Sequence, residues 1–184
     1  MDASVLTPDD VVYYLAVSLD GHLARPDGGV DWLDPFFIPE LGFHAFLARV
    51  GTVVIGRRTW DHIAAMGKYP YGDIPGIIAT SRKIEGPEAP VKTAEGTPAQ
   101  ILDAARKAGP GPYWVVGGAH LATGLIDAGL ITRIDLFTVP VLIGVGRPAF
   151  INRHDIALDL IGTETYPKGI VRTSWRPGPR VATA

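Results

Sequence analysis

The chain has 184 residues, 47% of them hydrophobic and 20% charged, which fits a single globular domain with a sizeable core. Its formal net charge is −2, so no overall positive field attracts nucleic acid or an anionic membrane surface. It contains no cysteine, which excludes disulfides and thiol nucleophiles, and no apolar run reaches the roughly 20 residues of a membrane span, so we expect a cytoplasmic protein.

The predicted elements begin with a buried strand over residues 11–17, which form a β-rich apolar run. Residues 18–38 are rich in Gly, Pro and Asp, and a loop of that length is often functional. Apolar residues recur at helical spacing over 39–50, which predicts a helix there. The remaining pattern predicts strands over 52–55, 76–80, 90–93, 113–116 and 131–139, and helices over 59–65, 98–108 and 119–128.

Two further patterns complete the predicted elements. Thr97 and Pro98 have the residue types of an N-cap and a first helical position, which supports the helix that ends at 108. Two apolar runs, 158–166 and 169–175, predict a closing hairpin. The alternation indicates a three-layer α/β/α domain with a mostly parallel central sheet and this C-terminal antiparallel hairpin. We expect one domain over 11–178, with tails at 1–10 and 179–184.

The strand over 52–55 ends in the motif Gly56-Arg57-Arg58-Thr59, directly before a predicted helix. The first turn of a helix carries backbone N–H groups without intrahelical partners, and these favour anions. A guanidinium adds a planar fork of donors that matches a phosphate group. The motif therefore predicts an anion site, and the alternative is a pair of solvated surface arginines.

Two other strand ends carry related chemistry. Ser81-Arg82-Lys83 follows the strand over 76–80, and Gly117-Gly118 lies between a strand and a helix. Either pattern alone is also typical of a polar loop or a tight turn. Because ligands of open α/β sheets lie beyond the carboxyl ends of the strands, the three ends together indicate an extended ligand with several phosphates. Two cationic turns favour NADPH over NADH, at a site without the usual G-x-G-x-x-G motif.

Five stretches spread over residues 11–175 match a known family. They are AVSLDGHLA (16–24), VIGRRTW (54–60), TSR (80–82), VGGA (116–119) and PVLIGVGRPAF (140–150). On these motifs the chain resembles the dihydrofolate reductase superfamily, most closely the reductase domain of bacterial riboflavin biosynthesis (the RibD C-terminal domain) in a stand-alone form. The resemblance implies a dihydrofolate reductase-like fold.

The resemblance also implies an activity. The family transfers hydride from NADPH to a small heterocyclic, carbonyl or imine substrate, as in 5-amino-6-(5-phosphoribosylamino)uracil reductase. The alternatives are a non-catalytic NADPH- or small-molecule-binding protein on the same scaffold, or a dihydrofolate reductase-type activity. The implied cofactor contacts are Ala16 and Val17 at the nicotinamide carboxamide, Gly56, Arg57, Arg58 and Thr59 at the phosphates, Ser81 and Arg82 at the 2′-phosphate, and Gly117, Gly118 and Ala119 at the diphosphate and nicotinamide.

Reduction of a carbonyl or imine carbon also needs a proton. Asp20, after the first strand, and Glu40, at the start of the helix predicted over 39–50, are the candidate catalytic acids. The plainer alternatives are a turn residue and a first-turn acid that the helix dipole stabilises. His22, Asp31 and Trp32 fall in the loop that the resemblance places at the substrate pocket, and they are the candidate substrate contacts.

The expected partner is a small-molecule substrate rather than nucleic acid or a membrane. A substrate phosphate would need its own cations, for which Arg25, Arg147 and Arg153 are the candidates. The five histidines show no metal-ligand spacing, so no metal is expected. The apolar segment 137–150 and the closing hairpin are compatible with a homodimer.

Overall fold

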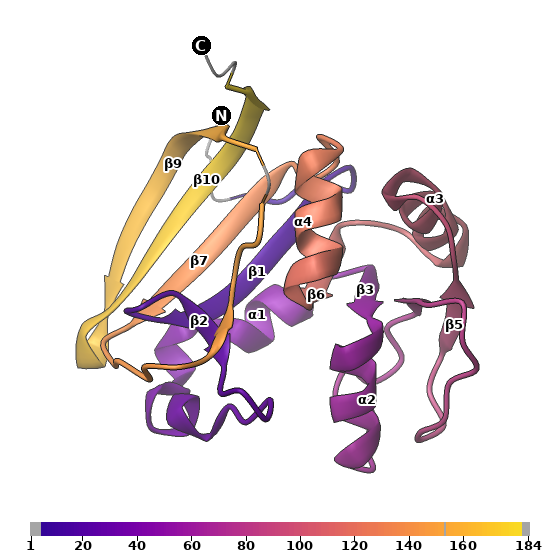
Figure 1. Ribbon diagram of the computed structural model, residues 1–184, viewed down its shortest axis with the longest axis horizontal. Coiled ribbons are helices and arrows are strands. Elements are labelled where there is room, and N and C mark those ends of the chain that lie inside the picture. The colour runs from indigo at the N-terminus through magenta and orange to yellow at the C-terminus, as the bar shows by residue number, and fades with distance from the viewer. Residues whose placement is uncertain (1–4, 153, 182–184) are drawn as a thin grey trace.

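The computed structural model describes residues 5–152 and 154–181, and its centre is one eight-stranded sheet (Figure 1). The strands are β1 (Val11–Ser18), β3 (Thr52–Gly56), β4 (Gly76–Ala79), β5 (Val91–Ala94), β6 (Tyr113–Gly117), β7 (Arg133–Val139), β9 (Ile156–Tyr166) and β10 (Ile170–Arg180). Their order across the sheet is β5-β4-β3-β6-β1-β7-β10-β9. A separate ribbon pairs β2 (His22–Ala24) with β8 (Arg147–Pro148). Arg153 and the outermost tail residues, 1–4 and 182–184, lie outside the described part.

The direction of the strands confirms the predicted sheet. All pairs from β5 across to β7 are parallel. The last strand pairs, β7 with β10 and β10 with β9, are antiparallel and form the predicted closing hairpin. Because β4, β3, β6 and β1 run in the same direction, their carboxyl ends meet at one edge of the sheet.

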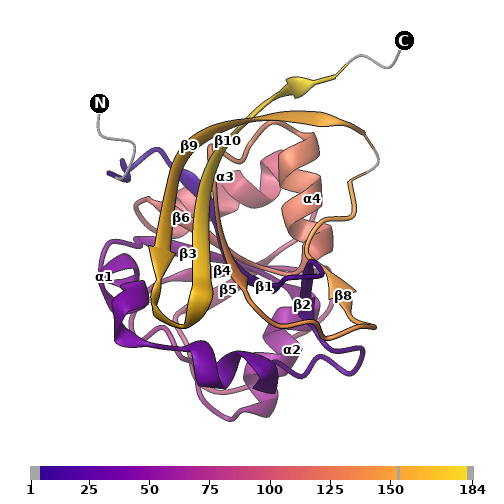
Figure 2. The same ribbon diagram turned by 90° about the vertical axis from the view of Figure 1, so that its left-hand side faces the viewer.

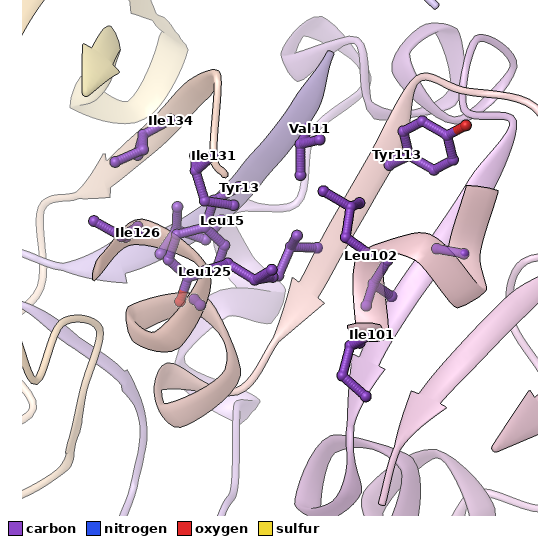
Figure 3. Close-up of a cluster of buried hydrophobic side chains, with 14 of the residues drawn as sticks. Val11, Tyr13, Leu15, Ile101, Leu102, Tyr113, Leu125, Ile126, Ile131 and Ile134 are labelled. Carbon is purple, nitrogen blue, oxygen red and sulfur yellow. The ribbon is translucent and has the colours of Figure 1, made fainter. Parts of the chain in front are cut away.

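Helices cover both faces of the sheet, as predicted. On one face α3 (Pro98–Ala108) packs on β3, β4 and β5, and α4 (Ala119–Asp127) packs on β3 and β6. Leu102 and Leu125 of these helices join Val11 and Tyr13 of β1 in a buried cluster (Figure 3). Figure 2 shows α1 (Phe43–Leu47) and α2 (Arg57–Ala65) on the opposite side. Trp60 of α2 is buried there. No helix of the described chain has the length and apolar character that crossing a membrane requires.

The start of α3 has the predicted cap. The Gln100 backbone N–H donates to the Thr97 hydroxyl oxygen at 3.3 Å, and the Thr97 backbone N–H donates to the Gln100 side-chain oxygen at 2.8 Å. This reciprocal pair is a capping box, which satisfies two donors that the first turn leaves without partners. It fixes the residue at which α3 begins.

The helix predicted over 39–50 is wrong as a continuous element. The segment forms one 3-10 turn, η2 (Pro39–Leu41), before the short helix α1, and another 3-10 turn, η1 (Asp31–Phe36), precedes it. Gly42 lies between η2 and α1 with φ 66°. This is the left-handed region, through which a right-handed helix cannot continue. Of the apolar residues in this pattern, Phe43, Phe46, Leu47 and Val50 pack in the buried cluster of Trp60 without one continuous helix to carry them.

The C-terminal boundary also differs from the prediction. β10 runs to Arg180, so the sheet continues past the expected domain end at 178. β9 is the outer strand of the sheet, and Leu158 and Leu160 on it are 44% and 56% exposed. Homodimer formation stays a prediction.

We expect Thr97→Ala to lower the free energy of unfolding by about 1 kcal/mol, because it removes the hydroxyl acceptor of the capping box. Thr97→Ser keeps that acceptor and is the matched control. Urea unfolding followed by circular dichroism measures both variants. An alanine variant as stable as the serine variant would contradict the assigned role of the cap.

Candidate functional site

A cleft of about 1800 Å³ opens at the carboxyl ends of the parallel strands. Its volume is above the roughly 300–1,000 Å³ typical of a site for one small ligand, so it has room for two. Ten of the eleven cofactor contacts implied by the resemblance line it: Ala16, Gly56, Arg57, Arg58, Thr59, Ser81, Arg82, Gly117, Gly118 and Ala119. The eleventh, Val17, is 4% exposed and belongs to the buried core beside the cleft.

The middle of the cleft is formed where two backbones touch. A Cβ atom on Gly56, at the end of β3, would lie 2.8 Å from the Gly118 nitrogen and 2.9 Å from the Gly117 oxygen. No side chain fits in that space, so the position requires glycine. Gly117 has φ 136°, and the peptide bond that joins it to Gly118 is cis. The pairing of β3 with β6 and the close approach at Gly56 hold the carboxyl ends of these two strands together.

Two helices begin at this contact. Gly56 is the N-cap residue of α2, and Gly118 is the N-cap residue of α4. Within the described chain neither helix has a side-chain cap, so the N–H groups of both first turns lack a partner from that source. Such N–H groups attract anions. The Thr59 hydroxyl oxygen lies beside them, 3.5 Å from the position of a Cβ atom on Gly118.

The two arginines after Gly56 have different surroundings. Arg57 donates from Nε to the Asp61 carboxylate at 2.7 Å and from Nη1 to the Lys83 carbonyl oxygen at 3.0 Å. Arg57 therefore ties the loop after β4 to α2. Arg58 is exposed on the cleft wall and has no hydrogen bond or ion pair to the rest of the described chain. Of the two, Arg58 is the one available to a ligand.

The end of β4 adds a second polar stretch to the wall. The Arg82 backbone N–H donates to the Thr80 hydroxyl oxygen at 3.1 Å, and both side chains line the cleft together with Ser81. The neighbouring strand β5 ends in Ala94, and the following Glu95 also lines the cleft. Sequence reasoning places Thr80 in the TSR motif without selecting it as a contact, and it missed Glu95, although each stands at a strand end where its position could have indicated a role.

The five residues predicted to contact or protonate the substrate lie elsewhere. Of the described residues that line the cleft, none is Asp20, His22, Asp31, Trp32 or Glu40. Asp31 forms an exposed ion pair with Arg25, in which Nε and Nη2 donate at 2.9 and 3.1 Å. Trp32 is buried, and Glu40 is exposed on η2.

Asp20 has a structural role. Its carboxylate accepts the backbone N–H groups of Ile143 and Gly144 at 3.3 and 2.8 Å, which ties the loop after β7 to the turn after β1. The Ser18 hydroxyl and these two N–H groups hold the pKa of Asp20 far below its usual range. His22 Nδ1 lies 3.6 Å from the same carboxylate. A carboxyl group with such a low pKa carries no proton to donate near neutral pH.

Apolar residues, which sequence reasoning did not select, form the rest of the wall. The segment after β2 contributes Val30, Leu33 and Phe37, so the loop predicted to border a pocket does so through other residues than those named for it. Phe43 of α1 and Phe137 of β7 also line this part. Within the described chain no group of three or more metal-ligating side chains lies close enough to hold an ion.

The chain is similar to known proteins along most of its length. The model of the RibD C-terminal domain family matches residues 10–172. The uncharacterized protein YwjB of Bacillus subtilis (strain 168) is 31% identical over 163 residues, which are 86% of this chain and 93% of YwjB.

Two solved structures show the same fold. A protein of Shewanella sp. PV-4 named for riboflavin biosynthesis superposes with a TM-score of 0.79 at 24% identity, over 92% of this chain and 99% of that chain. Dihydrofolate reductase from Enterococcus faecalis, solved with NADP(H), superposes with a TM-score of 0.69 at 14% identity, over 95% and 100% of the two chains. The dihydrofolate reductase-like fold implied by the sequence motifs is confirmed.

We expect Gly56→Ala to lower the free energy of unfolding by about 3 kcal/mol, because its methyl group would overlap the backbone at Gly117 and Gly118. Gly118→Ala is the matched control, since the nearest atom to its methyl group is the Thr59 hydroxyl oxygen at an ordinary 3.5 Å. The control should change stability by less than about 1 kcal/mol. Equal losses in urea unfolding would contradict the assigned backbone contact.

We expect Asp20→Asn to lower the melting temperature at pH 7 and to leave ligand binding in the cleft unchanged. The folded state lowers the pKa of Asp20, so its carboxylate stabilises the fold above the unfolded pKa of about 3.9, and that stabilisation is lost as the pH falls below it. The difference in melting temperature between wild type and variant should therefore shrink as the pH falls from 5 towards 3. A pH-independent difference would refute the role of the charge.

Proposed function

The chain belongs to the RibD C-terminal domain family, and from this premise we propose that it is an NADPH-dependent reductase of a small heterocyclic, carbonyl or imine substrate. The observation that carries the proposal is the meeting of two uncapped helix N-termini over the backbone contact between Gly56 and Gly117-Gly118. That contact offers several N–H donors to a diphosphate without a side chain in the way.

The order of the strands supports an extended cofactor. The carboxyl ends of β4, β3 and β6 are neighbours, and adjacent strands lie about 4.8 Å apart. A ligand that spans them meets Ser81 and Arg82, then Arg58 and Thr59, then the two glycines. We assign the adenosine 2′-phosphate to the first pair and the diphosphate to the glycines. This arrangement also supports the preference for NADPH over NADH, since NADH has no 2′-phosphate to use Arg82.

The residues of the chain would bind and orient the reactants. When bound, NADPH supplies the hydride. Ala16 and Ala119, on either side of the glycine contact, would border the nicotinamide ring, and the apolar wall beyond them would hold the substrate beside it. The fold is that of a reductase solved with NADP(H), which supports this use of the cleft. Holding two reactants in a productive orientation is the main contribution a protein makes to such a reaction.

We expect the double variant Arg58→Ala/Arg82→Ala to bind NADPH at least roughly tenfold more weakly, because it loses two charge-assisted contacts to phosphate. Its weak affinity for NADH should change less, since the 2′-phosphate contact is absent there. Fluorescence titration with each cofactor measures the effect, and Arg176→Ala, an exposed arginine outside the cleft, is the control. An unchanged NADPH affinity would refute the phosphate assignment. Cofactor binding without NADPH oxidation on the pyrimidine intermediate, dihydrofolate or a carbonyl panel would refute the reductase.

A further inference from the structure

The wall of the cleft changes character along the order of the strands. Next to β3, β4 and β5 it carries Arg58, Arg82 and Glu95. Next to β1, β7 and β10 it is apolar, with Val30, Leu33, Phe37, Phe43, Phe137 and Ile170 as the main contributors. We call the latter part the apolar half. The glycines at the end of β6 lie between the two parts, because β6 stands between β3 and β1 in the sheet.

Aromatic rings give the apolar half a fixed base. The Tyr14 ring stacks on Phe46 with centroids 4.0 Å apart and an interplanar angle of 13°, and its centroid lies 4.7 Å from that of Phe137. Trp114 meets Phe43 edge to face at 5.8 Å. Burial raises the pKa of Tyr14 above its usual value, so its phenol is neutral at working pH. Stacked rings of this kind suit a flat, uncharged ligand.

Two apolar side chains of this half face solvent. Val30 is 40% exposed and Phe37 is 54% exposed, and both line the cleft. A ligand in the apolar half would cover them, and the apolar area removed from water would favour binding.

The cations around the apolar half are engaged with protein atoms. Arg147 lines the cleft and donates from Nε and Nη2 to the Pro26 carbonyl oxygen at 3.2 and 3.0 Å. Lys168 donates to the Pro35 carbonyl oxygen. Arg172 pairs with Glu164 through Nη2, while its buried Nε has no hydrogen-bond partner among the described residues. Of these three cations only Arg147 lines the cleft, so an anionic group placed among the aromatic rings would lose water and would find no second cation among the described residues of this part of the wall.

We propose that the substrate of this reductase is an uncharged, flat, ring-bearing carbonyl or imine compound, without the phosphate or carboxylate that a cationic pocket would recognise. The proposal rests on the proposed function and narrows its substrate class. In the carbonyl case hydride from NADPH forms a C–H bond at the carbonyl carbon, the π electrons of the C=O bond move to oxygen, and a water molecule protonates that oxygen. The products are the alcohol, NADP⁺ and the hydroxide that the water leaves.

The test measures binding with a matched pair of probes, naphthalene-2-carboxamide and 2-naphthoate. They share the ring system and differ in charge. Calorimetric titration of the wild-type protein, with and without NADPH, should show the neutral amide binding at least roughly tenfold more tightly. Equal affinities, tighter binding of 2-naphthoate, or no binding of either probe would overturn the proposal.

Variants locate the binding. Phe37→Ala should weaken amide binding severalfold, whereas Leu142→Ala, which removes an exposed leucine outside the cleft, should not. Val30→Arg should shift the preference towards 2-naphthoate by placing a guanidinium in the apolar half. If wild type binds 2-naphthoate and Arg147→Gln abolishes that binding, Arg147 is an anion site and the proposal fails. NADPH titration of the same samples distinguishes the proposed function from the proposed substrate class. If the wild-type protein does not bind NADPH, the proposed function is refuted. The preference between the two probes without NADPH tests the apolar half alone.

Discussion

The close approach of Gly56 to the Gly117-Gly118 backbone is the constraint on which the site depends. It brings the ends of β3 and β6 within contact distance and starts α2 and α4 at the same point. A side chain at Gly56 would push the two strand ends apart and separate the two sets of N–H donors. The packing of the sheet and the proposed anion site of the cleft therefore depend on the same atoms.

The polar part of the cleft wall, next to β3, β4 and β5, could be predicted from the sequence, because its polar residues come shortly after predicted strands. A glycine or hydroxyl at the end of a β-rich run lies at the sheet edge whenever the sheet is parallel, whatever the details of packing. Arg57 shows the limit of that reasoning. Its residue type fits a phosphate, yet in the structure its guanidinium donates to Asp61, one turn further along α2, and to the Lys83 carbonyl oxygen. The folded loop after β4 brings the second of these partners within reach.

The apolar half could not be predicted, because its residues come from an irregular segment whose path the sequence pattern leaves open. Gly42 breaks the expected helix through its left-handed φ, and the 3-10 turns before it decide which side chains reach the cleft. Asp20 and Asp31 were selected as acids near the expected pocket. In the structure the Asp20 carboxylate accepts two backbone N–H groups of the loop after β7, and the Asp31 carboxylate forms an exposed ion pair with Arg25.

The division of the cleft has a consequence for orientation. Phosphates are stable beside the helix N-termini and Arg58, and they would lose hydration without compensation among the rings of Tyr14 and Phe137. Under the proposed function a dinucleotide would therefore lie with its adenosine end towards β4 and its nicotinamide end towards β1. Its nicotinamide ring would then face the apolar half. The asymmetry of the two halves thus supports the proposed direction of the cofactor together with the proposed character of the substrate.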